Sequence, residues 1–152
     1  MRRHVRSPFF VVALALGLFA AAVWFARTST PRESYANARQ YSRVGCAAAD
    51  DAFHRRRSGQ WLTVSGTVKH GLSDAYGRYQ HQRFILQCLN GMTILIVNDV
   101  GVGRRVPIAN HAQVAVRGQY VWDRQGGLVH FTHHGNGGEP GGWILYGFRL
   151  FQ

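Results

Sequence analysis

Apolar and polar residues alternate along the second half of the chain, which is the pattern of half-buried β-strands. The alternation predicts five strands, over residues 61–69, 83–89, 92–97, 113–122 and 128–134. We expect turns between them at Gly71–Gly77 and at Asn90-Gly91, the latter a typical hairpin pair. Trp143–Tyr146 predicts a last strand or a cover for the sheet. This pattern favours a mainly β fold, a small OB-like five-stranded antiparallel barrel, with an open meander packed on a helix as the alternative.

Ahead of the strands, residues 32–57 carry apolar side chains at near-helical spacing, so we expect a helix or a pair of helices there. Ser34 is placed to cap the start, while Arg55–Arg57 and then Ser58-Gly59 are placed to end it. The three arginines also offer a basic surface to anionic lipid headgroups or nucleic acid. A solvated helix end is the favoured interpretation of the three arginines.

The first 27 residues resemble an export signal. Three arginines precede the uncharged stretch Pro8–Ala26, whose 19 residues would span about 28 Å as a helix, close to the thickness of a bilayer core. The positive charges ahead of this stretch predict an N-terminus inside the cell and a domain outside it. We therefore expect a single-pass protein of the bacterial inner membrane with a periplasmic C-terminal domain. The small residues Ala20–Ala22 keep open the alternative of a cleaved signal peptide and release into the periplasm.

These features divide the chain into a signal anchor over 1–27, a spacer and helix over 28–57, and a β-barrel domain over 58–152. A length of 152 residues supports one small folded domain. Export would place Cys46 and Cys88 in an oxidising compartment, where they could form a disulfide. Two separate buried thiols are the alternative.

Charge and composition narrow the choice of partners. The chain has 18 Lys and Arg against 7 Asp and Glu, and 46% of its residues are hydrophobic, which excludes a disordered polymer. From Ser58 onward the basic residues are scattered singly, apart from Arg104-Arg105, and do not form the basic face expected of a nucleic-acid-binding protein. The inner membrane is the expected partner, while nucleic acid, glycan and a second copy of the chain stay open.

Histidines are concentrated in the predicted β domain, and His130, His133 and His134 fall within five residues. On a regular strand, with Phe131 pointing into the core, His130 and His134 would face outward together. His81 is then the natural third ligand for a transition metal such as zinc or copper. The alternative is that these histidines only form hydrogen bonds on a half-exposed strand.

An enzymatic version of this hypothesis needs a base and groups that stabilise negative charge. The catalytic candidates are Asp74, His81 and His133, of which Asp74 could instead serve as a fourth ligand or orient one. Arg83 and Arg117 would stabilise charge during metal-assisted hydrolysis of a phosphodiester or a similar bond.

Aromatic residues gather around the last predicted hairpin and could stack on bases or sugar rings, although core packing is the commoner use of such residues. They are Tyr120, Trp122, Phe131, Trp143 and Tyr146. The candidate ligand-binding residues are Arg83, Asn98, Tyr120, Trp122 and Trp143.

Several short strings carry a family resemblance: HQRFIL at His81–Leu86, Asn98-Asp99, GQYVW at Gly118–Trp122, GGLVHFTHH at Gly126–His134 and GGW at 141–143. In these strings the chain resembles the small exported bacterial proteins of domain of unknown function family 3465. The likeness covers about Trp61–Tyr146 and leaves the first 57 residues outside. It implies that the histidines at 81, 130, 133 and 134 belong to one motif set, and it implies no activity.

One departure from the family pattern bears on the site. Many members have an Asp-Pro pair after the double histidine, whereas this chain has Gly135-Asn136. If that aspartate were a ligand or a base, this protein would lack it.

Three functions are consistent with the sequence. The first is a membrane-tethered periplasmic OB-like binding domain whose histidine-rich face binds a ligand such as a transition metal. The second is a metal-dependent, nuclease-like hydrolase of the cell envelope. The third is a structural envelope protein with no ligand.

Overall fold

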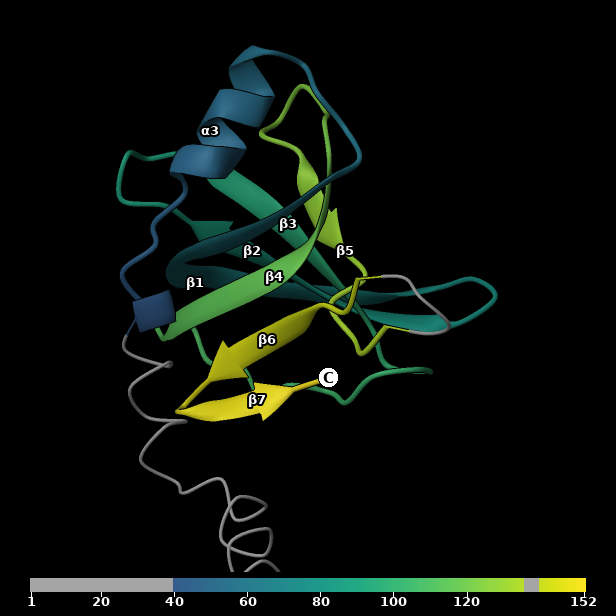
Figure 1. Cartoon of the computed structure of the whole chain (residues 1–152). Coiled ribbons are helices and arrows are strands. Elements are labelled where there is room, and N and C mark those ends of the chain that lie inside the picture. The colour runs from purple at the N-terminus through teal and green to yellow at the C-terminus, as the bar shows by residue number, and fades with distance from the viewer. Residues whose placement is uncertain (1–39, 136–139) are drawn as a thin grey trace, which may run out of the picture. The chain divides into compact units, whose positions relative to one another are not determined.

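The computed structural model describes residues 40–135 and 140–152. In these ranges no helix is long and apolar enough to cross a membrane. The predicted anchor at Pro8–Ala26 and the predicted cap at Ser34 lie outside the described residues. The elements, shown in Figure 1, are α3 (Ala47–His54), β1 (Gln60–Tyr76), β2 (Gln80–Gln87), β3 (Thr93–Asp99), β4 (Gln113–Val121), β5 (Leu128–His130), β6 (Trp143–Tyr146) and β7 (Arg149–Phe151).

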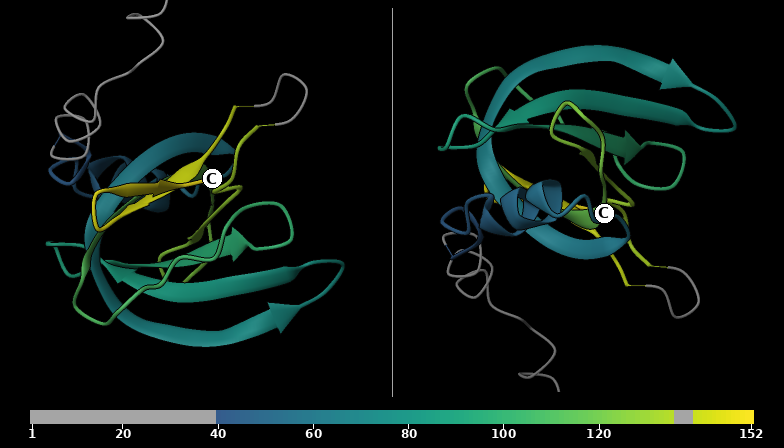
Figure 2. Two further views of the ribbon diagram at one scale, coloured as in Figure 1. Left: turned by 90° about the horizontal axis from the view of Figure 1, so that it is seen from below. Right: turned by 90° about the horizontal axis from the view of Figure 1, so that it is seen from above.

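Five of the strands form a closed ring. They pair in the order β1-β2-β3-β5-β4, and β4 pairs back onto β1. The ring closes because β1 is long enough to pair twice, with β4 over its first half and with β2 over its second, and it curves around the ring in both views of Figure 2. Gly66 lies where β1 changes partner, and a side chain there would overlap the carbonyl oxygen of Gln87. Only β3 and β5 are parallel among the described pairs, and β6 and β7 extend from β4 as a hairpin.

The interior of the ring is filled by the inward residues of each strand, as the alternation predicts. Fully buried side chains include Val64, Phe84, Ile96, Tyr120 and Val129. The mainly β character and the Asn90-Gly91 turn are confirmed, and so is a late strand at Trp143–Tyr146.

The two largest differences from the predicted strand boundaries are at the ends of β1 and β5. The expected turn at Gly71–Gly77 is wrong, because β1 continues to Tyr76 and pairs with β2 along this stretch. The pairing has two register irregularities, between Val68 and His70 and between Leu72 and Ala75. They let the strand include residues whose composition favours a turn. The fifth strand ends at His130 and does not continue to 134, because Phe131 takes a left-handed backbone conformation with φ 54°.

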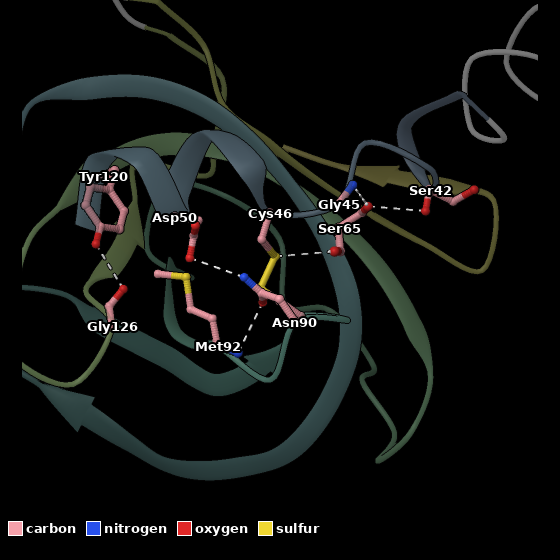
Figure 3. Close-up of a disulfide and its surroundings, with 10 residues drawn as sticks. Ser42, Gly45, Cys46, Asp50, Ser65, Asn90, Met92, Tyr120 and Gly126 are labelled. Carbon is pink, nitrogen blue, oxygen red and sulfur yellow. Dashed lines mark hydrogen bonds between the residues drawn. A yellow bond between two sulfur atoms is a disulfide. The ribbon is translucent and has the colours of Figure 1, made fainter. Parts of the chain in front are cut away.

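The helix α3 is attached to the ring by covalent and polar contacts. Cys46, at its N-terminus, forms a disulfide with Cys88 just after β2, with 5.9 Å between the Cα atoms (Figure 3). The carboxylate of Asp50 accepts a hydrogen bond from the side chain of Asn90 at 3.2 Å, and Ala49 and Ala52 are buried. The structure therefore contains the expected disulfide, and the alternative of two separate buried thiols is wrong.

Candidate histidine centre

The strand directions bring distant histidines to one end of the ring. Since β3 runs parallel to β5 and antiparallel to β2, the start of β2 and the ends of β3 and β5 lie together. We call this the histidine end, because it carries His81, Asp99 and His130. The opposite end, where β2 ends at the Cys46–Cys88 disulfide and α3 is attached, is called the helix end.

At the histidine end the alternation of β2 and β3 turns His81 and Asp99 to the outside of the ring. Their neighbours Gln82 and Asn98 are buried inside it. His81 and Asp99 are direct partners across the two strands, and Nε2 of His81 lies 3.9 Å from Oδ2 of Asp99. The acidic neighbour of His81 is therefore Asp99, where the sequence suggested Asp74.

The chain after β5 does not follow the expected alternation. Phe131 is 41% exposed, so the prediction that it points into the core is wrong, and Thr132 is buried instead at 1%. The reason is the left-handed backbone at Phe131, which ends the strand and reverses the order of inner and outer positions. His133 is consequently the third histidine beside His81 and His130, and His134 is exposed.

His130 is the most unusual member of this group. Its Nε2 atom is buried and makes no hydrogen bond with any described residue. Burial lowers the pKa of His130, and the nearby charges of His133 and His81 lower it further. Its ring lies 4.0 Å from that of Phe131, which in turn stacks at 6.4 Å on Trp61. The surroundings therefore favour the neutral form of His130, and its Nε2 atom lacks a hydrogen-bond partner.

The other two imidazoles are oriented by neighbouring oxygen atoms. Nδ1 of His133 lies 2.8 Å from the backbone oxygen of His134. Because a carbonyl only accepts, this contact places the proton on Nδ1 and leaves the Nε2 lone pair of His133 free. Carbonyl and carboxylate partners of this kind are typical of histidines that bind metals. As the side chains stand, however, no three His, Cys, Asp or Glu residues in 40–135 and 140–152 are grouped closely enough to hold an ion.

A buried amide network lies directly beneath the histidine end. The side chain of Gln82 donates to the backbone oxygen of Val106 at 2.6 Å and accepts from the backbone N–H of Val106 at 2.9 Å. The Asn98 amide donates to the backbone oxygen of Arg104 at 2.9 Å and, at 3.2 Å, to Gln82. Asn98 also accepts from the Thr132 hydroxyl at 3.0 Å. The network ties two loops to the inside of β2 and β3.

This network explains how the histidine end is positioned. Thr132 is held inside the ring by Asn98, so Phe131 and His133 are fixed on either side of it. Asn98, predicted as a ligand-binding residue, is instead buried and hydrogen-bonded to protein groups through both its amide nitrogen and its amide oxygen. The sequence did carry a signal for this burial, because Gln82 and Asn98 occupy inward positions of alternating strands.

Asp74 is engaged elsewhere. Its carboxylate forms an ion pair with Arg105 and accepts a hydrogen bond from Gln80. The hydrogen bond from Arg105 is the largest cause of the lowered pKa of Asp74. Arg83, the candidate for charge stabilisation, donates to the backbone oxygen of Ser73 at 2.8 and 3.0 Å. Asp74 and Arg83 therefore brace the β1–β2 hairpin.

The candidate aromatic ligand residues are separated from one another. Tyr120 lies in the core, donates to the backbone oxygen of Gly126 (Figure 3), and has its pKa raised to about 12 by burial. Trp122 packs on α3 through Phe53, and Trp143 packs on Tyr41 with 4.6 Å between ring centroids. These side chains do not form one surface. Tyr120 is a core residue, which is the alternative that the sequence left open for these aromatic side chains.

The comparison with known families bears directly on these motifs. The model of the family described as "Protein of unknown function (DUF3465)" matches residues 36–152. The chain belongs to this family. The resemblance seen in the motifs is confirmed, but its extent was too narrow, because the match includes α3 and β7. No curated protein and no solved structure shows a significant match to the chain.

The motif strings of this DUF3465 domain have two distinct roles in the structure. His81, His130 and His133 lie at the outer surface of the histidine end. Gln82 and Asn98, from the same strings, are buried in the network beneath it. The motif set therefore combines a partly buried group of imidazoles with the buried polar groups that position it.

Proposed function

We propose that the domain is an OB-like barrel that binds a divalent transition-metal ion, zinc or copper, at its histidine end. OB-folds bind their ligands on the outer face of strands 2 and 3. In this chain the five-strand ring presents His81 from β2 and Asp99 from β3 on that face, and His130 follows from β5, the neighbour of β3.

The observation that carries the proposal is the buried, unpaired Nε2 atom of His130. A buried polar atom without a partner destabilises the fold, so a native structure that keeps one calls for an explanation. A metal ion would satisfy this nitrogen, and neutral imidazole is the form that binds zinc or copper. The free lone pair on His133 supplies a second ligand of the same kind.

The remaining step is closure of the ligand set. His81 and His133 are only partly buried, so rotation of their side chains can bring ring nitrogens toward His130. A zinc–nitrogen bond needs about 2.0–2.1 Å, which sets the size of the closed site. Asp99 would then orient His81, as carboxylates do beside zinc-bound histidines.

We further propose that the domain works in the periplasm, tethered by the apolar stretch Pro8–Ala26. The Cys46–Cys88 disulfide supports an exported location, because such bonds persist in oxidising compartments. The arginines before the apolar stretch support the inside orientation of the N-terminus.

The test is metal binding by the full chain, purified in detergent and freed of metal with EDTA. We expect about one equivalent of Zn²⁺ or Cu²⁺ by elemental analysis and calorimetry, with affinity at least tenfold lower in His130→Ala and His133→Ala. His70→Ala, which removes an exposed histidine from β1, is the matched control and should bind like the wild type. Absence of binding, or equal affinity in His130→Ala, would overturn the proposal and favour a structural envelope protein.

A metal-dependent hydrolase is the second candidate, favoured by the His81–Asp99 pair at 3.9 Å. In that function His81 would not ligate the metal and, with Asp99, could accept a proton from a metal-bound water. We expect His81→Ala to abolish hydrolysis of a chromogenic phosphodiester by the zinc-loaded protein. No turnover by the zinc-loaded wild type would leave the binding function alone.

A further inference from the structure

Arginine occupies an unusual backbone position at the end of α3. The helix ends with Arg57 N–H bonded to the Ala52 oxygen at 2.9 Å and Arg56 N–H bonded to the Phe53 oxygen at 3.0 Å. This is the Schellman motif, in which the residue at the Arg56 position takes the left-handed conformation and is usually glycine. Arg56 has φ 51°. A strained non-glycine residue of this kind is a reason to look for function in its side chain.

The side chain of Arg56 lies over a fixed aromatic surface. Its guanidinium carbon is 5.7 Å from the ring centroid of Trp122. The indole Nε1–H donates to the Phe53 oxygen at 3.0 Å, and the ring stacks on Phe53 with 6.4 Å between centroids. The backbone N–H of Trp122 also donates to Ser58. Trp122 is therefore held in place by both α3 and the segment that follows it.

A hollow of about 610 Å³ opens here at the helix end, lined by Phe53, His54, Arg56, Trp122 and Arg124. No carboxylate belongs to this lining, and in the described ranges none lies within ion-pair distance of Arg56 or Arg124. The nearby acids have other partners: Asp51 pairs with Arg55 at 2.7 Å, Asp50 faces His54, and Asp123 accepts from the backbone amides of Gln125 and Gly127.

We propose that this hollow binds a phosphate group, held by the guanidinium groups of Arg56 and Arg124 against the indole of Trp122. Guanidinium groups match the geometry of phosphate oxygens and bind them through paired hydrogen bonds. The indole of Trp122 forms one wall of the hollow, so a bound phosphate would contact solvent on fewer sides. The site is separate from the histidine end and does not depend on metal binding.

The phosphate can belong to a phospholipid headgroup or to a small soluble molecule, and the experiment separates the two sources. The full chain, ¹⁵N-labelled in detergent with EDTA present, is titrated with glycerol 3-phosphate and, separately, with short-chain phosphatidylglycerol. Sodium chloride at matched ionic strength is the control. The indole N–H resonance of Trp122, assigned with Trp122→Phe, reports binding.

We expect saturable movement of the Trp122 resonance with at least one phosphate probe and none with chloride. Saturation by the lipid alone would identify a headgroup site, and saturation by both would identify a site for phosphate esters in general. Arg124→Gln and Arg56→Gly should each weaken binding at least fivefold. Arg149→Gln, which removes an exposed arginine from β7, should leave it unchanged.

Arg56→Gly guards against a trivial loss of folding, because glycine suits the left-handed position and keeps the helix end intact. Equal binding by Arg56→Gly and the wild type would overturn the proposal, and so would equal movement of the resonance with chloride. A failed metal experiment would leave this result unaffected, because EDTA is present throughout.

Discussion

The two ends of the five-strand ring are stabilised by different means. At the helix end the Cys46–Cys88 disulfide and the backbone hydrogen bonds that end α3 hold the chain in place. At the histidine end a buried amide network holds two loops, while the Nε2 atom of His130 is left without a partner. The contacts at the helix end join main-chain segments, whereas the network also fixes the segment that carries Phe131 and His133.

The difference separates the stability of the domain from its proposed function. Loss of a contact at the helix end should lower stability and leave the imidazoles in place. Loss of a contact in the network should affect both, because Thr132 links the buried Asn98 to the segment that carries Phe131 and His133. The predictions below test this contrast.

The largest effect should come from the disulfide. It closes a loop with a sequence separation of 42, for which loss of the cross-link is expected to lower the free energy of unfolding by about 4 kcal/mol. Chemical denaturation of Cys46→Ser/Cys88→Ser measures the loss. The variant should still bind metal under conditions where it is folded, and loss of metal binding by the folded variant would contradict the separation of the two ends.

Breaking the network should have the next largest effect. Asn98→Ala leaves the Thr132 hydroxyl and the Arg104 carbonyl without their partner, which should lower the free energy of unfolding by about 2–3 kcal/mol. Asn90→Ala, at the exposed turn of the helix end, should cost less than about 1 kcal/mol. Denaturant titrations compare the two variants. A loss in Asn98→Ala no larger than that in Asn90→Ala would show that the network does not stabilise the domain.

The stability of the metal-free protein should depend on pH through His130. Because the folded-state pKa of His130 lies below its ordinary value of 6.5, the unfolded chain takes up this proton first as the pH falls. The contribution of neutral His130 to the free energy of unfolding is fully present above pH 6.5 and is lost as the pH falls through the folded-state pKa. The free energy of unfolding then falls by at most about 1.4 kcal/mol per pH unit. Thermal or denaturant unfolding of the wild type and of His130→Gln between pH 7.5 and 5, values chosen to bracket roughly that range, measures this slope. If both proteins lose stability in parallel, His130 is not the group responsible.

The smallest effect should be a gain. Arg56→Gly removes the strain of the left-handed position and should raise the free energy of unfolding by about 0.5–1 kcal/mol. Arg57→Gly, one residue later and outside that position, should give no gain. Denaturation midpoints decide between them, and a lower stability of Arg56→Gly would show that the contact with Trp122 outweighs the backbone strain.

The elements with local causes could be predicted from the sequence. Alternation placed the strands, and Asn90-Gly91 placed a hairpin turn, because turn geometry depends on the residues in the turn itself. The grouping of His81 with the later histidines was also within reach. The predictions that were wrong concern features that depend on tertiary contacts. Phe131 leaves the strand where Thr132 is bonded to Asn98, a residue 34 positions away.

The predicted length of β1 was wrong for a similar reason. Gly71–Gly77 has the composition of a turn, but β2 pairs with this stretch and outweighs the local preference. The third histidine was predicted wrongly for the same reason. The change of backbone conformation at Phe131 places His133, not His134, beside His81 and His130.

The most direct test of the central claim is to record the imidazole nitrogen resonances of the ¹⁵N-labelled full chain before and after one equivalent of Zn²⁺. We expect Nε2 of His130 and of His133 to shift as metal-bound nitrogens, His81 to respond with them, and His70 and His111 to stay unchanged. If none of the three moves, or if the two control histidines move equally, the histidine end is not a metal site.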